Sequence, residues 1–337
     1  MRENRLNVLY QFDNKYAPYA GVSITSLLEN NSDFDHICIY ILENGVSEEN
    51  KTLFMKTAQK YQGCEIRIIK TDALVAQMKQ WDMPSYRGSY AANLRLFFDY
   101  LIEDDIESLV YLDSDTVITG SLRDLVETDI GNCALGMVVD ALGRKHKKYL
   151  GLESEKYYYN SGMLLYNTKR WKELECSERI VEHIKNVRSH YVSPDQDLLN
   201  VVLKGKIFPL PTSYNYQPVY CLLTDQQYLR IFKEEGFYSK QEMQEARENI
   251  CIYHTYRFLG EFPWHKNNSH PNNDLFDYYL EKSLWSDYVK QDANTGAVMK
   301  LEKILFKILP HTVFFRIFRM VYDIMDYRQD CRLKKSK

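Results

Sequence analysis

Short apolar runs alternate with helical patterns through the first third of the chain. The apolar runs cover residues 6–12, 36–42, 65–70 and 108–112, and helical spacing marks 19–29, 47–61 and 91–102 between them. This alternation predicts parallel strands joined by crossover helices. We therefore expect an α/β fold with a mainly parallel, Rossmann-like sheet and helices on both faces, extended by later strands at 134–139, 161–167 and 250–254. Ligands of such sheets bind beyond the carboxyl ends of the strands.

Charge is distributed unevenly along the 337 residues. The formal net charge is only −3, which gives no reason to expect a nucleic-acid partner. Residues 300–337, in contrast, contain ten Lys or Arg against four Asp or Glu, and residues 225–248 are charged and helical in pattern. We expect a catalytic domain over 1–292 with a helical insertion at 225–249, followed by a basic amphipathic tail over 293–337.

The tail repeats polar residues at steps of three and four over 310–328, which predicts an amphipathic helix. These polar positions are Thr312, Arg316, Arg319, Asp323 and Asp326, and they leave a wide apolar face. Such a face packs on the domain itself, on a second subunit or on a membrane surface. Because Lys334, Lys335 and Lys337 follow the helix, we favour peripheral contact with an anionic membrane.

The cysteines and the N-terminus indicate a compartment. Seven scattered cysteines contain no Cys-x-x-Cys pair, and reduced thiols are the simplest interpretation. The first residues form too short an apolar run for a secretory signal, and no run of about 18 apolar residues is available to span a membrane. We therefore expect a cytoplasmic protein that contacts the inner face of the membrane only peripherally.

An apolar strand pattern ends directly in two carboxylates, Asp113 and Asp115. In a strand, side chains at i and i+2 point to the same face, so this pair could share one cation. Carboxylate oxygens suit Mn²⁺ or Mg²⁺, and such an ion neutralises a diphosphate leaving group. A solvated turn after a strand explains the same pattern, so the rest of the chain must decide.

Several further pieces follow one another in a fixed order. They are Asp13-Asn14-Lys15-Tyr16, Arg95, Leu112-Asp113-Ser114-Asp115, Tyr159-Asn160-Ser161-Gly162, Asp195-Gln196-Asp197, His254 and Pro263-Trp264-His265. With this ordered set the chain resembles the family 8 retaining glycosyltransferases, which include bacterial lipopolysaccharide galactosyl- and glucosyltransferases and, more distantly, glycogenin. The resemblance spans about residues 7–268 and implies a nucleotide-diphospho-sugar transferase fold of the GT-A type.

The resemblance implies retaining transfer of glucose or galactose from UDP-glucose or UDP-galactose to a hydroxyl of a glycan or lipid-linked saccharide. It also makes His254 the third protein ligand, beside Asp113 and Asp115, of a Mn²⁺ ion, with Mg²⁺ as the alternative. A neutral imidazole is a good ligand for Mn²⁺. Considered alone, a histidine at the end of a strand is more often a packed or solvated residue.

The same resemblance assigns the donor nucleotide to the loop after the first strand. Asp13 and Tyr16 match a carboxylate that pairs with uracil and a ring that stacks on it, and Asn14 and Ser114 belong to the same group. A flat base does need an aromatic face and an acceptor for its N–H group. Arg95 would turn from an amphipathic helix toward the donor diphosphate or sugar.

The sugar and the reacting carbon are assigned to another group of residues. Asp140, Asn160 and Trp264 would contact the sugar, whereas Asp195 and Gln196 would lie beside the anomeric carbon. Gln196 acts either as a nucleophile or as a dipole that stabilises oxocarbenium character, and we favour the dipole because an amide oxygen is a poor nucleophile. A helix N-terminus, where acidic residues are favourable, would also explain the aspartates of this motif.

One departure from the family pattern concerns the phosphates. The family has a lysine just before Pro-Trp, where this chain has Phe262. We expect Arg257 or Lys266 to supply the missing cation.

Two other functions are compatible with the same residues. A nucleotide-sugar hydrolase or a nucleotidyltransferase could use the same metal and base sites without a saccharide acceptor. An inactive carbohydrate-binding protein is the third interpretation, although such a protein has no need to keep both carboxylates and the histidine.

Overall fold

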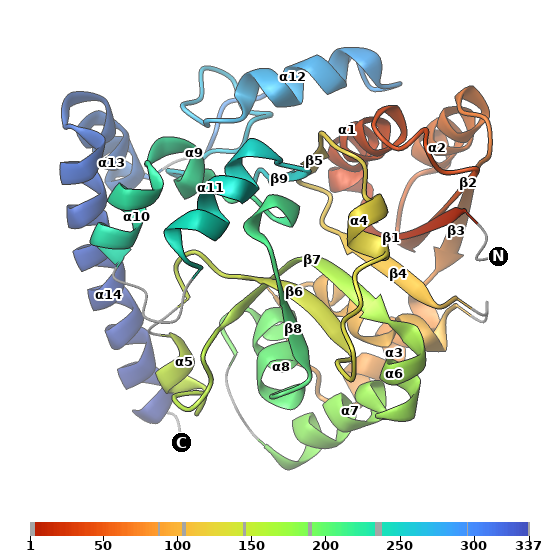
Figure 1. Cartoon of the computed structure of the whole chain (residues 1–337), viewed down its shortest axis with the longest axis horizontal. Coiled ribbons are helices and arrows are strands. Elements are labelled where there is room, and N and C mark those ends of the chain that lie inside the picture. The colour runs from red at the N-terminus through yellow and green to blue at the C-terminus, as the bar shows by residue number, and fades with distance from the viewer. Residues whose placement is uncertain are drawn as a thin grey trace.

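The structure is a computed structural model that describes residues 4–86, 88–102, 106–143, 146–187, 191–232, 238–294 and 296–335. A seven-stranded sheet runs through its middle in the order β3-β2-β1-β4-β7-β6-β8 (Figure 1). Its strands are β1 (Arg5–Asp13), β2 (His36–Asn44), β3 (Cys64–Lys70), β4 (Ser108–Leu112), β6 (Leu135–Val139), β7 (Tyr159–Asn167) and β8 (Ile207–Leu210). A second sheet pairs β5 (Thr116–Ile118) with β9 (Ile252–His254).

The large sheet is mainly parallel. β1 pairs in parallel with β2 and β4, β2 with β3, and β6 with β8. β7 pairs antiparallel with both β4 and β6. The described part of the connection from β6 to β7 contains the short helix α5 (His146–Tyr149). The expected mainly parallel α/β fold is confirmed.

Apolar side chains are buried on both faces of this sheet. Val8, Tyr10 and Phe12 of β1 pack in a cluster that includes residues of α1 (Ala17–Glu29), α2 (Glu48–Lys60) and α12 (Asn273–Lys282). Leu9 belongs to a second cluster, with residues of α3 (Asp72–Gln80), α7 (Cys176–Asn186) and α8 (Pro194–Val202). Because successive strand residues point to opposite faces, the two clusters lie on the two sides of the sheet, and helices cover both.

A third apolar cluster joins the expected insertion to the expected tail. Its helices are α9 (Pro218–Leu222), α10 (Asp225–Phe232), α11 (Lys240–Glu248), α13 (Ala297–Ile308) and α14 (His311–Lys335). Phe306, Phe314 and Phe315 of the two tail helices are buried in it, and α14 lies against α10 (Figure 1). The described residues of 225–249 include α10 and α11, while the insertion and the domain boundaries stay predictions. No helix in the described part of the chain is long and apolar enough to cross a membrane.

The remaining elements are short. They are the helices α4 (Arg123–Val126) and α6 (Thr168–Glu173) and the 3₁₀ helices η1 (Asn14–Tyr16), η2 (Ala91–Tyr100) and η3 (Thr212–Tyr214).

The expected amphipathic α-helix over 91–102 is wrong in type. Ala91–Tyr100 forms the 3₁₀ helix η2, which is interrupted at Phe97 by a non-helical backbone. The side chain of Gln11 explains this difference, because it bonds to the backbone of the segment at two points. Its Oε1 accepts from the N–H of Arg95 at 2.6 Å, and its Nε2 donates to the carbonyl of Ala92 at 2.8 Å.

The pairing of β5 with β9 brings distant parts of the sequence together. Thr116 lies opposite His254 in its antiparallel register. Just beyond the pairing, Thr255 donates to the carbonyl of Asp115 from its backbone N–H at 2.7 Å and from its hydroxyl at 2.8 Å. The turn after β4 is therefore fastened to the end of β9. A three-residue strand such as β5 is too short to show a period in the sequence.

Buried hydroxyl groups form a chain of hydrogen bonds that ends at the same turn. The hydroxyls of Tyr10 and Ser23 lie 3.0 Å apart, as do those of Ser23 and Thr116, and Thr116 donates to the carbonyl of Asp113 at 2.8 Å. A carbonyl only accepts, so the hydrogen bonds run in one direction, from Tyr10 through Ser23 and Thr116 to Asp113. They connect β1, α1 and the turn between β4 and β5.

Replacing Thr116 with valine tests this support. Thr116→Val keeps the size of the side chain but removes the hydroxyl that accepts from Ser23 and donates to the Asp113 carbonyl, so the buried Ser23 hydroxyl loses its acceptor. We expect the free energy of unfolding to fall by about 1–3 kcal/mol. Urea unfolding followed by circular dichroism measures the change.

The matched control is Thr52→Val on the exposed face of α2, where the hydroxyl bonds to the carbonyl of Glu48 within the helix. This control should change the free energy of unfolding by less than about 0.5 kcal/mol. Equal losses for the two variants would contradict a special contribution from the buried hydroxyls.

Candidate functional site

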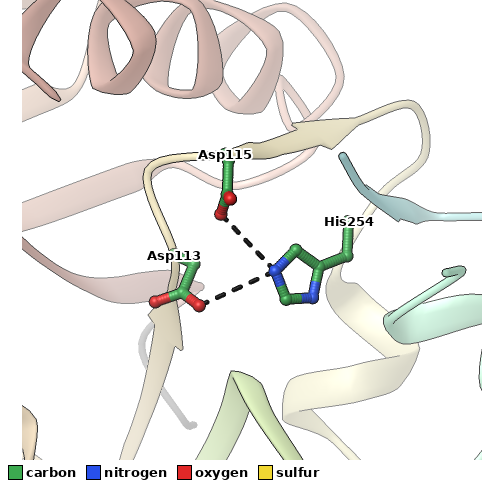
Figure 2. Close-up of side chains that lie close together, drawn as sticks. All are labelled: Asp113, Asp115 and His254. Atoms are coloured by element: carbon green, nitrogen blue, oxygen red, sulfur yellow. Dashed lines mark ion pairs between the residues drawn. The ribbon is translucent and has the colours of Figure 1, made fainter. Parts of the chain in front are cut away.

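Asp113, Asp115 and His254 converge beyond the carboxyl end of β4 (Figure 2). Ligand atoms of the three side chains all lie within 4.8 Å of one another. His254 Nε2 lies 3.7 Å from Asp113 Oδ2 and 3.4 Å from Asp115 Oδ1. The three side chains that the sequence singled out for a metal site therefore meet in space.

The carboxylates meet for a different reason from the one expected. β4 ends at Leu112, and both carboxylates belong to the turn before β5, so strand alternation does not align them. The N–H of Thr116 donates to the carbonyl of Asp113 at 3.1 Å and closes this turn. The expectation that they share a face of one strand is wrong, and the turn brings them together instead.

This set of groups fits a divalent cation. Two carboxylates and one imidazole are ligands that suit Mn²⁺ and are compatible with Mg²⁺. Burial lowers the pKa of His254, but the hydrogen bond and charge of Asp115 and the charge of Asp113 outweigh it and raise that pKa. The two carboxylates thus favour positive charge beside them, whether it is carried by the imidazole or by a bound cation.

The two oxygens of the Asp113 carboxylate have different partners. Oδ1 accepts from Arg95 Nη2 at 2.8 Å and from the Tyr111 hydroxyl at 2.5 Å. Oδ2 faces His254. Arg95 also packs on Tyr111, with its guanidinium carbon 4.1 Å from the centre of the ring. One oxygen therefore anchors the carboxylate, and the other is directed toward the cluster.

Arg95 is buried, and protein groups accept its hydrogen bonds. Its Nη1 donates to the Ser161 carbonyl at 2.7 Å and lies 3.5 Å from Asp195 Oδ2, while Nε donates to the Ala92 carbonyl at 3.1 Å. Burial lowers the pKa of Arg95, but the charge of Asp113 above all outweighs burial and raises it, so the group stays charged. Arg95 does turn inward as expected, and its contact with a donor stays a prediction.

Three side chains assigned to the sugar and the reaction join one hydrogen-bond network. Asp140 Oδ2 accepts from Asn160 Nδ2 at 3.0 Å and from Gln196 Nε2 at 3.3 Å. Gln196 Nε2 also lies 3.0 Å from the Tyr158 hydroxyl, and its Oε1 accepts from the Ser161 N–H at 3.0 Å. The amide of Gln196 is therefore held at both ends.

The two aspartates around Gln196 have different environments. Asp197 Oδ2 accepts from two backbone N–H groups just before α8, at 3.0 Å each, so the helix N-terminus explains it. Asp195 instead accepts from the Ser161 hydroxyl at 2.9 Å. Burial raises the pKa of Asp195, although Arg95 opposes the increase.

The residues expected to hold the nucleotide lie at the carboxyl end of β1. Asp13 Oδ1 accepts from two backbone N–H groups of η1, at 3.0 and 3.2 Å, and Asn14 Oδ1 accepts from two groups at the start of α2, at 2.9 Å each. Tyr16 follows in η1 and is partly buried, and the buried hydroxyl of Ser114 lies 3.5 Å from the Gln11 carbonyl. These contacts fix the loop, and its contact with a nucleotide stays a prediction.

Trp264 lies in an aromatic stack. Its ring centroid is 3.8 Å from that of Tyr19 and 4.3 Å from that of Phe262, with nearly parallel planes, and Tyr16 meets it edge-on at 6.3 Å. Only 3% of Trp264 is exposed. The indole therefore packs against the ring of Tyr16, and its expected contact with a sugar stays a prediction.

Arg257 and Lys266, the cations expected to replace the family lysine, lie in different surroundings. Arg257 Nη2 is 3.3 Å from Met299 Sδ of α13, and Lys266 is exposed. Lys303 of α13 pairs with Glu261 at 2.5 Å, a contact that the sequence did not indicate. The role of Arg257 and Lys266 in phosphate binding stays a prediction.

Gly162 gives the imidazole its space. A Cβ atom on Gly162 would lie 2.0 Å from His254 Cε1 and 2.4 Å from Nδ1. On its other sides the ring meets Asn215 Oδ1, 2.9 Å from Nδ1, and the edge of Tyr256, 4.9 Å between ring centroids. Sequence reasoning found Gly162 only as part of a motif. It missed Asn215 and Tyr256, which stand in no recognisable pattern, and it gave no role to Tyr111 of the strand pattern before Asp113.

Substituting Gly162 tests how closely the imidazole must approach β7. Gly162→Ala should displace the His254 ring and weaken Mn²⁺ binding by at least about tenfold, as expected when the support of a ligand is lost. Titration with Mn²⁺ followed by electron paramagnetic resonance measures free and bound ion.

The control is Gly136→Ala in β6, where the added Cβ meets the side chain of the buried Leu210 at 2.9 Å, away from His254. This variant should bind Mn²⁺ like the unchanged protein, even if it unfolds at a lower temperature. If Gly162→Ala also keeps full affinity, the close approach has no importance for the ligand.

Comparison with known proteins gives one consistent result. The model of glycosyl transferase family 8 matches residues 7–268. General stress protein A of Bacillus subtilis (strain 168) is 25% identical over 289 residues, which are 85% of this chain and 96% of that protein. Lipopolysaccharide 1,2-glucosyltransferase of Escherichia coli (strain K12) is 28% identical over 300 residues, 86% of this chain and 82% of that protein.

Solved structures agree with this at the level of the fold. The galactosyltransferase LgtC, in complex with donor and acceptor sugar analogs, matches with a TM-score of 0.63 at 23% identity, over 83% of this chain and 96% of that one. The bifunctional glycosyltransferase WbbM matches with a TM-score of 0.69 at 22% identity, over 84% of this chain and 50% of that one. Because the family model also covers most of the sequence, the chain belongs to glycosyl transferase family 8.

Proposed function

We propose that this enzyme transfers glucose or galactose from a UDP-sugar to a hydroxyl of a glycan or lipid-linked saccharide, with retention of configuration at the anomeric carbon. The observation that carries the proposal is the cluster of Asp113, Asp115 and His254. It lies beside the hydrogen-bond network of Gln196, Asp140 and Asn160, since Arg95 contacts Asp113 and the Ser161 carbonyl at once. A cation site and a polar sugar site side by side suit a reaction in which a nucleoside diphosphate leaves a sugar.

In this proposal Asp113, Asp115 and His254 hold Mn²⁺, with Mg²⁺ as the alternative. A bound divalent cation would supply Lewis-acid neutralisation of the diphosphate leaving group. Arg95 keeps the carboxylate of Asp113 in place through the 2.8 Å bond to Oδ1. Asp13, Asn14, Tyr16 and Ser114 bind the nucleotide, and Arg257 or Lys266 binds its phosphates.

Asp140, Asn160 and Trp264 are assigned to the sugar in the same proposal. Gln196 lies beside the anomeric carbon and stabilises positive charge there by its dipole. The bonds at both ends of the Gln196 amide support this role, because a fixed dipole requires no reorganisation during the reaction. Asp195, held by the Ser161 hydroxyl, positions this part of the site.

A donor panel tests the proposed reaction. UDP-glucose, UDP-galactose and other UDP-sugars are incubated with Mn²⁺ and a set of mono- and disaccharides, and UDP release and product mass are measured. Release that depends on an acceptor, with a product one hexose heavier, is the expected result. Free sugar without an acceptor would indicate a hydrolase, UDP-sugar made from UTP a nucleotidyltransferase, and binding without turnover a carbohydrate-binding protein.

Asp115→Asn is the sharpest variant for the metal in this assay. Asp115 pairs with His254, whereas Asp113 also anchors Arg95 and Tyr111, so Asp115→Asn removes one ligand charge and leaves those contacts in place. We expect turnover at low Mn²⁺ to fall by at least about 100-fold with little change in melting temperature. Full activity at low Mn²⁺ would refute the metal assignment.

We further propose a cytoplasmic location with peripheral contact to the inner face of the membrane through the tail. α14 buries Phe314 and Phe315 and leaves a second apolar face in solvent. The exposed apolar residues of α13 and α14 are Val298, Leu301, Ile304, Ile308, Val313, Ile317, Met320, Val321, Ile324, Met325 and Tyr327. So many exposed apolar side chains on two successive helices favour an interaction surface, and exposed Lys300, Lys307 and Arg316 lie on the same helices.

Two of the polar positions of the tail helix face the protein, which the sequence did not predict. Arg319 and Asp323 form an ion pair at 3.1 Å, Arg319 is buried, and its guanidinium lies 5.4 Å from the ring centroid of Phe232 in α10. They do not lie on the solvent face of the helix as expected. Lys337 and the side chains of Asp326, Lys334 and Lys335 lie outside the described residues.

A truncation of the tail would also remove the buried Phe306 and disturb the packing of the domain. Exposed tail residues can instead be changed while both helices stay in place. Ile304→Gln, Ile308→Gln and Met320→Gln together should reduce cosedimentation with anionic vesicles several-fold and leave the melting temperature nearly unchanged. Binding of the unchanged protein should fall as salt is added. The control is Val289→Gln, at an equally exposed valine outside the tail. An unchanged protein that never cosediments would refute the membrane proposal.

A further inference from the structure

We infer that Asn215 is a positioning residue that fixes the tautomer of His254 and couples this metal ligand to the sugar-binding side chains Asn160 and Asp140. The inference rests on the proposed function, because it takes His254 Nε2 as a metal ligand. Asn215 is fully buried and lies between the two groups of the site. Its Oδ1 is 2.9 Å from His254 Nδ1, and its Nδ2 is 2.9 Å from Asn160 Oδ1.

The direction of each hydrogen bond follows from one backbone group. The N–H of Gly162 can only donate, and it lies 3.0 Å from Asn160 Oδ1, so that atom is the amide oxygen. Asn160 Oδ1 then also accepts from Asn215, which must present its NH₂ group. The other end of the Asn215 amide is therefore its oxygen, and the imidazole must carry a proton on Nδ1 to bond to it.

The reversed orientation of either amide is unfavourable. A flipped Asn160 would place its NH₂ group against the Gly162 N–H and its oxygen against the carboxylate of Asp140, which now accepts from Nδ2 at 3.0 Å. A flipped Asn215 would place its oxygen against Asn160 Oδ1. Each flip leaves buried polar groups unpaired, at a cost of about 1–3 kcal/mol per group.

The consequence for the metal site is a defined ligand atom. With the proton on Nδ1, the Nε2 lone pair of His254 points toward Asp113 and Asp115, at 3.7 and 3.4 Å. Partners of this kind hold the ring of a ligand histidine and set its tautomer, and their loss typically lowers metal affinity 10–100-fold. Because Asn215 is buried with no exposed surface, water cannot easily take its place.

The same chain of bonds reaches the sugar side of the site. Asn160 Nδ2 and Gln196 Nε2 both donate to Asp140 Oδ2, at 3.0 and 3.3 Å. A change in the orientation of Asn160 therefore affects Asp140 on one side and, through Asn215, the imidazole on the other. We assign no substrate contact to Asn215 itself.

Two substitutions separate the two ends of the Asn215 amide. Asn215→Leu removes both the acceptor for His254 and the donor for Asn160 at similar size. Asn215→Asp keeps an oxygen for His254 but turns a second oxygen toward Asn160 Oδ1. If Asn215 acts as inferred, the first variant disturbs the metal ligand, whereas the second disturbs chiefly the sugar side.

The direct readout is the nuclear magnetic resonance spectrum of the His254 ring nitrogens in protein labelled with ¹⁵N-histidine. The protein contains eight histidines, so such a spectrum has few signals. The His254 signal is assigned by its loss in His254→Gln, and spectra are recorded without metal at a pH where the ring is neutral. The unchanged protein and Asn215→Asp should show a protonated Nδ1. Asn215→Leu should show a mixture of tautomers or the Nε2-protonated form.

Metal binding and kinetics give the second and third readouts. Asn215→Leu should bind Mn²⁺ 10–100-fold more weakly, while Asn215→Asp should keep an affinity near that of the unchanged protein but lose kcat/KM for the UDP-sugar. The matched control is Asn31→Leu, which removes a fully buried amide that bonds to the Leu27 carbonyl and the Leu122 N–H far from His254 in sequence. It should lower the melting temperature without changing the His254 spectrum or Mn²⁺ affinity.

The outcomes distinguish this inference from the proposed function. An unchanged His254 spectrum and unchanged Mn²⁺ affinity in Asn215→Leu would refute the inference, even if the enzyme is an active transferase. A protein that binds no Mn²⁺ in its unchanged form would refute the proposed metal site, even if the tautomer follows Asn215 as inferred. Equal spectral changes in Asn31→Leu would reduce Asn215 to a residue of general stability.

Discussion

The antiparallel pairing of β5 with β9 is the contact on which the site depends. It places Thr116 opposite His254 and lets Thr255 bond twice to the Asp115 carbonyl. Each strand is only three residues long and belongs to no part of the large sheet. A pair this short has little stability alone. Its stability comes from burial, because Val117, Ile118 and Ile252 are all enclosed in the cluster on the α1 side of the large sheet.

Electrostatic balance is the second constraint. Arg95 places one buried positive charge between Asp113 and Asp195, at 2.8 and 3.5 Å, and a buried charge is tolerated only with such partners. Asp113 Oδ1 is used by Arg95 and Tyr111, so only Oδ2 faces the imidazole. The same carboxylate therefore serves the packing of the protein with one atom and the chemistry of the site with the other. Asp115 instead lies 3.4 Å from His254 Nε2, and its charge raises the pKa of that imidazole.

The sequence predicted the α/β class from strand and helix periods, which are local features, and it predicted the meeting of Asp113, Asp115 and His254 from the family resemblance that the ordered motif set carries. It failed where a distant side chain decides the local structure. Gln11 turns the segment expected to be an α-helix into η2 through two bonds to its backbone, and nothing within 91–102 indicates this. Asn215 was missed for the same reason, since its importance lies in the two neighbours that the fold brings to it. The tail was predicted to have one apolar face, whereas packing against α10 divides its apolar residues into a buried and an exposed set.

The separation of the cluster along the chain has a consequence for the order of folding. Asp115 and Thr255, which tie the turn to the end of β9, are 140 positions apart. During synthesis the strands β1 to β4 can pair long before β9 exists, so the turn with its two carboxylates at first lacks both the imidazole and the two bonds from Thr255. Contacts that close so long a loop form late, because the entropy of closure must be overcome before they contribute. A cation that needs all three ligands would therefore bind only the completed fold and would stabilise it by mass action.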